Sequence, residues 1–179
     1  CNSCRYTANI EKAEGLRQQA GAAGQGELTK IHTPDKKTIA DVAAFLGLPA
    51  AATVKTLVLT DGEGQFVMAL VRGDHELNEL KLKNHLGWAE IRMADDADIL
   101  RFTGSQPGFL GPVGLREPLV VVADFALEPM ADLIIGANEV DQHHTGANQG
   151  RDFQISQIAD IRLIRSEERR VGKECRSRW

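Results

Sequence analysis

The seven residues Gly108–Gly114 could bind a negative charge without any charged side chain. They contain three glycines and one proline, a composition that disfavours both a helix and a central strand. A tight loop of this kind can point backbone N–H groups at an anion or at the developing oxyanion of an acyl-transfer reaction. A plain surface turn would need the same residue types. The loop is therefore a candidate oxyanion site, and the residues around it decide whether it is functional or a plain turn.

Lys55 is a second candidate, because it interrupts the apolar stretch Val54–Leu59. Strand alternation places Lys55 on the same face as Leu57 and Leu59. A lysine on an apolar face needs either an anion or a path to solvent. Two interpretations stay open: an edge lysine whose ammonium reaches water, or a cation directed at a phosphate or carboxylate in a pocket.

Histidines and acids elsewhere give weaker signals. Adjacent His143 and His144 would face opposite ways in a strand, so both cannot easily bind one metal ion. Near His75, Asp74 could cap a following helix and Glu76 would suit its first turn. No metal-ligand spacing accompanies these residues, and we expect no metal site.

The usual signatures of covalent or nucleotide-dependent catalysis are absent from the sequence. It has no Gly-x-Ser-x-Gly elbow, no Walker loop and no dinucleotide fingerprint. An enzyme built from the remaining groups would act on an already activated bond, such as an ester. Positioning and oxyanion stabilisation would then supply most of the catalysis.

Composition and charge further limit the classes of protein to which the chain can belong. The 179 residues are 42% hydrophobic and 26% charged, which is typical of a globular domain, and no apolar run is long enough to cross a membrane. The net charge is −4, and it is more negative without the basic tail 165–179, which argues against broad nonspecific binding of nucleic acid. The three cysteines, Cys1, Cys4 and Cys175, form no disulfide framework, so we expect reduced thiols and a cytoplasmic location.

The pattern around the candidate residues predicts a single α/β or α+β domain, a mixed sheet flanked by helices. Strands are expected at 28–33, 53–60, 65–72, 88–93, 119–123, 131–137 and 142–145. Helices are expected at 39–46, after an N-cap at Thr38, and at 76–86 and 95–102.

Six motifs in order resemble a known family and span nearly all of residues 1–164. They are Cys1-x-x-Cys4-x-Tyr6-x-Ala8-Asn9, Lys55-Thr56-Leu57, Ala69–Asn78, Gly108-x-x-Gly111-Pro112-Val113-Gly114, Gly136-Ala137-Asn138 and Gly150-Arg151-Asp152-Phe153. Together they resemble bacterial-type prolyl-tRNA synthetase, and more narrowly its inserted editing domain, of the YbaK-like deacylase family. Each motif alone is modest, and their shared order makes the resemblance specific.

The resemblance implies a role for particular residues. Lys55 matches the family's essential lysine, which holds the tRNA 3′ end or the aminoacyl group. Gly108 and Pro112, with Gly111 between them, match a loop whose N–H groups face the ester carbonyl. Ile39 and Val42 match positions that would line a small pocket. Thr33, Asp124 and His143 match polar positions around the terminal adenosine. Of these three, His143 is also expected to be catalytic.

The implied activity is hydrolysis of alanine wrongly esterified to the tRNA for proline, in cis within the synthetase. No cofactor is expected for editing; ATP with magnesium would serve only the parent synthetase core, which this chain does not complete. Expected partners are the tRNA for proline and the rest of a homodimeric synthetase, with no membrane. The alternatives are a free-standing trans-editing deacylase and a non-catalytic insert that binds tRNA.

The expected organisation has four parts. Residues 1–27 would be a flank of the catalytic core and a linker, and 28–149 the editing domain. Residues 150–164 would return to the core, and the Arg/Glu/Ser-rich stretch 165–179 would be a foreign or disordered tail.

Overall fold

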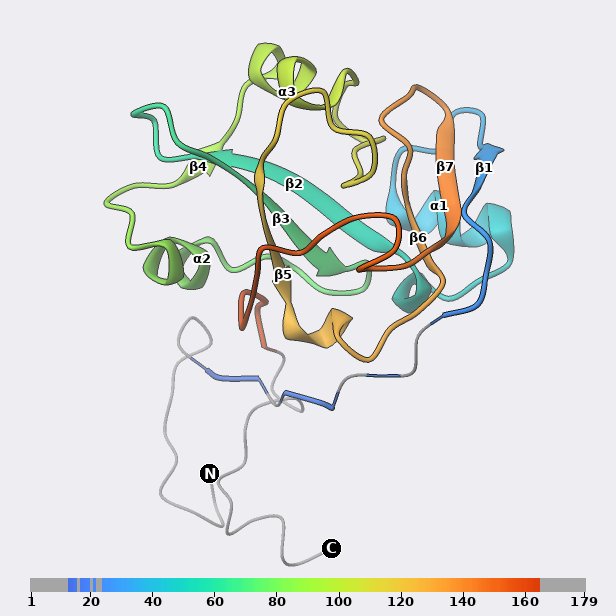
Figure 1. Ribbon diagram of the computed structural model, residues 1–179, viewed down its shortest axis with the longest axis horizontal. Coiled ribbons are helices and arrows are strands. Elements are labelled where there is room, and N and C mark those ends of the chain that lie inside the picture. The colour runs from blue at the N-terminus through green and yellow to red at the C-terminus, as the bar shows by residue number, and fades with distance from the viewer. Residues whose placement is uncertain (1–12, 16, 20, 22–23, 165–179) are drawn as a thin grey trace, which may run out of the picture.

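The computed structural model describes residues 13–15, 17–19, 21 and 24–164 (Figure 1). The Cys1–Asn9 motif and the predicted foreign tail lie outside the described residues. The strands are β1 (Thr29–His32), β2 (Val54–Thr60), β3 (Phe66–Arg72), β4 (Arg92–Met93), β5 (Val120–Asp124), β6 (Leu133–Gly136), β7 (Gln142–Ala147) and β8 (Gln157–Ala159). The helices are α1 (Ile39–Leu46), α2 (Glu79–Leu86) and α3 (Asp96–Thr103), with short 3-10 turns η1 (Ala50–Ala52) and η2 (Phe125–Leu127).

The strands form two sheets, which confirms the α+β class expected from the sequence. One sheet has the order β4-β2-β3-β5-β8, in which β3, β5 and β8 run parallel and the other pairs are antiparallel. The other has the antiparallel order β1-β7-β6. A bridge between Thr53 and Ile134 joins them at the start of β2. In Figure 1, α1 lies beside the three-stranded sheet, and α2 lies at the opposite end near β4.

The middle strand β3 is buried on both faces, as its continuous apolar sequence predicts. Met68 and Leu70 pack into a cluster that includes residues of the three-stranded sheet and of α3. Val67, Ala69 and Val71 face the other way, toward Leu82 of α2 and Ile161. The sheet therefore carries core on both sides and fixes the strand ends on which the candidate site depends.

Local capping signals position the helices, with one correction. Thr38 caps α1 by accepting a hydrogen bond from the Asp41 N–H, and Gly47 ends that helix in the left-handed conformation. The expectation that Asp74 caps the next helix is wrong, because Asn78 accepts the Lys81 N–H and α2 begins at Glu79. Residues 74–78 thus form a loop ahead of the helix rather than its first turn.

The expected boundary at residue 149 does not appear in the fold. β8, which has no counterpart among the strands expected from the sequence, extends the large sheet by pairing with β5. Beyond it, Ile161 and Ile164 are fully buried. Near the N-terminus, the Gly15 N–H donates to Asp160 at 2.8 Å. Residues 150–164 and 13–15 therefore pack as parts of the same folded body.

None of the helices in the described part of the chain has the length and apolar character needed to span a bilayer.

Candidate active site

A cavity of about 570 Å³ opens where the start of α1, the first half of β2, the loop after β3 and the glycine loop meet. Its lining includes several of the residues predicted from the sequence: Lys55, Gly108, His143, Ile39 and Val42. These residues come from four separate elements. Only the packing of the two sheets and α1 brings them to one place.

Lys55 lies on β2 and lines the cavity, with 24% of its side chain exposed. Its ammonium donates to the His75 carbonyl at 3.0 Å and to Glu76 Oε1 at 2.9 Å. The side chain thus reaches both the cavity and a nearby carboxylate, and it has the position required of a cation that binds a ligand anion.

The glycine loop packs backbone against backbone on β6. A Cβ atom at Gly111 would lie 1.9 Å from the Gly136 carbonyl oxygen, so neither position accepts a side chain. Gly108 has φ of 103°, which favours glycine, and it lies on the exposed side of the loop, facing the cavity. Pro112 is buried and does not line this cavity.

The proposed role of Gly111 needs correction. Its N–H donates to Asn138 Oδ1 at 2.8 Å and is not directed at a substrate carbonyl. Gly111 therefore shapes the loop through its close packing, and Gly108 is the loop glycine that meets the cavity.

Asn138 shapes the site through its contacts with the glycine loop, although it is not among the site residues expected from the sequence. Its amide nitrogen donates to the carbonyls of Gly111 and Val113, both at 2.8 Å. Its backbone N–H donates to the Phe109 carbonyl at 2.9 Å, and its φ of 53° is one that asparagine tolerates well. The Gly136-Ala137-Asn138 motif was the available signal, but the sequence does not show which loop the amide would bind.

We expect Asn138→Gly to lower the free energy of unfolding by about 2–3 kcal/mol. Glycine keeps the left-handed backbone but removes three side-chain hydrogen bonds, each worth about 0.5–1.5 kcal/mol. Urea denaturation measures the loss. Asp35→Gly is the matched control, because Asp35 has a similar φ of 58° and its side chain makes no hydrogen bond to another described residue. An equal loss in both variants would contradict the assigned role of the amide.

His143 projects into the cavity from β7, and Thr33 lies behind it. The Thr33 hydroxyl and His143 Nδ1 are 2.7 Å apart. Burial lowers the pKa of His143, which favours the neutral form of its imidazole. Thr33 is fully buried, so the expected substrate contact of its side chain is corrected to orientation of His143.

The adjacent residues His143 and His144 face opposite ways on β7, as strand geometry predicts. His144 pairs across the sheet with Lys30 of β1 and Ile135 of β6, and it does not line the cavity. Among the described residues, no group of three or more His, Cys, Asp or Glu could hold a metal ion. The expectation that editing needs no cofactor stays a prediction.

Ile39 and Val42 give the cavity an apolar wall on α1. Val42 is buried and Ile39 is half-buried, and their i, i+3 spacing places both on the same helix face. This face also contacts the body of the protein, so the two side chains serve packing and lining together.

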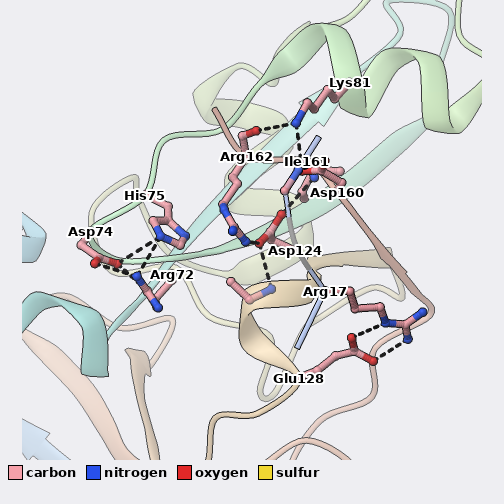
Figure 2. A network of polar contacts seen from close by, with 12 residues as sticks. Arg17, Arg72, Asp74, His75, Lys81, Asp124, Glu128, Asp160, Ile161 and Arg162 are labelled. Carbon is pink, nitrogen blue, oxygen red and sulfur yellow. Dashed lines mark hydrogen bonds and ion pairs between the residues drawn. The ribbon is translucent and has the colours of Figure 1, made fainter. Parts of the chain in front are cut away.

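Asp124 lies away from the cavity, and its predicted contact with the terminal adenosine is corrected to a structural role. Its side chain is fully buried and accepts hydrogen bonds from Arg162 Nη1 at 2.8 Å, Ala126 N at 2.9 Å and Ile161 N at 3.0 Å (Figure 2). The carboxylate thus ties the end of β5 to the segment after β8.

Comparison with known proteins identifies the family. Residues 33–153 match the family described as the aminoacyl-tRNA editing domain. The chain belongs to this family. It is 77% identical over 164 residues to a proline–tRNA ligase of Trichlorobacter lovleyi and 59% identical over 166 residues to that of Pelobacter propionicus. These matches cover 92% of the chain but only 28% and 29% of the two ligases.

The editing-domain fold is also found among solved structures. The structure of a proposed trans-editing enzyme for prolyl-tRNA synthetase matches with a TM-score of 0.62 at 24% identity. The match covers 75% of this chain and 86% of that one. At this identity the likeness supports the fold alone.

Proposed function

We propose that this editing domain hydrolyses the ester of alanyl-tRNA for proline and acts in cis within a proline–tRNA ligase. The observation that supports the proposal most is the shared cavity of Lys55, Gly108 and the apolar wall of α1. The high identity to proline–tRNA ligases supports the choice of tRNA. The chain spans less than a third of those ligases, so the activity of a whole ligase is not assigned to it.

The need for such an activity follows from the size of the two amino acids. Alanine is smaller than proline, so a synthetic site built for proline cannot exclude it sterically. Loss of a methylene group changes binding by only about 1–3 kcal/mol. A second pocket that accepts alanine and is too small for proline supplies the missing discrimination.

In the proposed reaction a water oxygen attacks the ester carbonyl carbon. The carbonyl oxygen becomes an oxyanion, which the backbone N–H groups on the Gly108 side of the loop stabilise. The bond to the ribose oxygen then breaks, and that oxygen takes a proton, giving free alanine and the 3′-terminal hydroxyl of the tRNA. A hydroxyl of the terminal ribose can assist the attacking water.

Lys55 and His143 have different parts in this scheme. The Lys55 ammonium binds a phosphate near the 3′ end and fixes the ester in the cavity. Neutral His143, held by Thr33, offers its second ring nitrogen as a hydrogen-bonding group to the terminal nucleoside. The pocket wall of Ile39 and Val42 contacts the methyl group of alanine.

The deciding experiment measures release of labelled amino acid from alanyl-, cysteinyl- and prolyl-tRNA for proline. We expect the chain to release alanine and to leave prolyl-tRNA intact. Hydrolysis of the cysteinyl ester would assign a different substrate. Failure to hydrolyse any ester, by a chain shown to be folded, would favour a non-catalytic tRNA-binding insert.

The choice between cis and trans action needs a second comparison. Free-standing activity is tested by adding the chain to alanyl-tRNA in the absence of any synthetase. Comparable kcat/KM for the chain alone and for the ligase that contains this region would favour the trans-editing alternative. A large advantage for the ligase supports action in cis.

We expect Ile39→Ala to widen the substrate range. Removal of the Ile39 side chain enlarges the pocket wall, so hydrolysis of prolyl-tRNA should rise about 10-fold or more relative to alanyl-tRNA. Deacylation assays with both substrates measure the ratio. Leu46→Ala is a suitable control, because Leu46 lies on the same helix outside the cavity. An unchanged ratio in Ile39→Ala would contradict the pocket assignment.

A further inference from the structure

The cation proposed to bind RNA already has an anionic partner within the protein. Glu76 Oε1 lies 2.9 Å from Lys55 Nζ, and both residues line the same cavity. The Glu76 side chain is 70% exposed, whereas that of Lys55 is 24% exposed. An RNA phosphate that approaches Lys55 Nζ therefore competes with the Glu76 carboxylate for the same ammonium group.

The two partners of Lys55 differ in how firmly they are held. The His75 carbonyl belongs to a tight loop in which the His75 N–H donates to the Arg72 carbonyl at 2.8 Å. Arg72 also forms two hydrogen bonds with Asp74, at 2.6 and 3.0 Å, and contacts His75, as Figure 2 shows. The loop thus presents a fixed carbonyl oxygen that can orient Lys55 without help from Glu76.

The Glu76 side chain is free to move although its backbone is fixed. The Glu76 carbonyl accepts the Leu163 N–H at 2.8 Å, and the next residue, Leu77, forms a bridge with Arg162. The carboxylate makes no other hydrogen bond with a described residue. Rotation about side-chain bonds alone can therefore carry it away from Lys55 into water.

An ion pair of this type is easily exchanged. Pairs in which one partner is mostly exposed contribute little, because water and salt compete for both charges. A phosphodiester of the RNA carries the same single negative charge as the carboxylate and also offers two acceptor oxygens to the ammonium. It can therefore replace Glu76 at Lys55 when other parts of the RNA bind in the cavity.

We propose that Glu76 is an exchangeable counter-ion of Lys55, displaced by a phosphate of the RNA 3′ end, and that it thereby limits the affinity of the site for RNA. The inference rests on the proposed function in taking RNA as the ligand. It assigns Glu76 an effect on binding rather than on the chemical step. In the absence of RNA, the Glu76 carboxylate balances the positive charge of the Lys55 ammonium at the cavity.

The test is the dissociation constant of an uncharged RNA acceptor-stem hairpin that ends in CCA, measured by fluorescence anisotropy with the full chain. We expect Glu76→Gln to lower this constant about 2- to 5-fold, the range that an exposed ion pair allows. In deacylation assays KM should fall by the same factor, with kcat changed less than twofold. Glutamine keeps the size and the acceptor oxygen, so folding should be unaffected.

Two comparisons separate this role from a general charge effect. Glu79→Gln removes the same charge from an exposed position nearby at the start of α2, and should change the dissociation constant by less than a third of the Glu76→Gln effect. In a Lys55→Met background, Glu76→Gln should have no effect, because the two residues act through one contact.

Other results would overturn the proposal. A lower kcat with unchanged KM in Glu76→Gln would make Glu76 a positioning residue for Lys55. If Glu79→Gln lowered the dissociation constant for RNA as much as Glu76→Gln, the change would be an effect of net charge. The same conclusion would follow if Glu76→Gln still lowered this constant in the Lys55→Met background. If the chain binds the RNA hairpin but hydrolyses no ester, the proposed function fails, while the ratio of dissociation constants still decides the role of Glu76.

Discussion

Replacement of Lys55 by alanine is expected to lower kcat/KM for alanyl-tRNA by about 100-fold or more. Loss of the Lys55 contact with a phosphate of the 3′ end lets the ester shift within the cavity, and a misplacement of about 1 Å can cost about 100-fold in rate. Lys55 is the lysine of β2, and it lines the cavity in which the 3′ end would bind.

Stability should change little in the same variant. The hydrogen bonds of Lys55 go to a mostly exposed carboxylate and to one carbonyl, so we expect the free energy of unfolding to fall by less than about 1 kcal/mol. Initial rates of alanine release and urea denaturation of the same preparations measure the two effects. Lys83→Ala is the control, because Lys83 is a lysine of α2 outside the cavity. Retention of wild-type kcat/KM in Lys55→Ala would exclude Lys55 from the site.

Replacement of Asp124 by alanine is expected to lower the free energy of unfolding by about 3–5 kcal/mol, the typical cost of removing one partner of a buried ion pair. The variant leaves the Arg162 guanidinium, whose side chain is only 8% exposed, without its carboxylate. The Ala126 and Ile161 N–H groups also lose their acceptor. Urea denaturation measures the loss.

The rescue experiment separates this structural role from substrate binding. Arg162→Met in the Asp124→Ala background removes the unpaired charge and should restore part of the lost stability. Under conditions in which Asp124→Ala remains folded, KM for alanyl-tRNA should stay within about twofold of the wild type, because Asp124 does not line the cavity. A large rise in KM with little loss of stability would instead return Asp124 to the substrate site. Asp96→Ala, at an exposed acid in the first turn of α3, is the control for removal of an aspartate.

The elements of this fold were largely predictable from local sequence. The Thr38 cap, the helix stop at Gly47 and the turn after Thr60 depend on residues within a few positions of one another. The apolar stretch that forms β3 predicted a central strand for the same reason. The weaker signals failed where a local alternative was available, as at Asp74, whose expected capping role belongs to Asn78.

Part of the candidate site was predictable as well. Strand alternation marked Lys55 as an unusual cation, and the helical repeat placed Ile39 and Val42 on one face. Resemblance to a family of known activity then suggested which of these residues share a site. The cavity confirms that they lie together, and their chemical roles stay predictions.

The partners of buried polar groups were decided by the tertiary structure. Gly111 meets Asn138 across 27 positions, Asp124 meets Arg162 across 38, and Thr33 meets His143 across 110. A polar side chain in a sequence is equally suited to bind a ligand or another part of the chain, and burial decides between them by requiring a hydrogen-bond partner. The sequence by itself determined which residues could do chemistry and which elements carry them. The packing of the two sheets determined that Lys55, Gly108 and His143 face the cavity while Asp124, Gly111 and Thr33 hold the protein together, because only long-range contacts settle which polar groups are satisfied inside the fold.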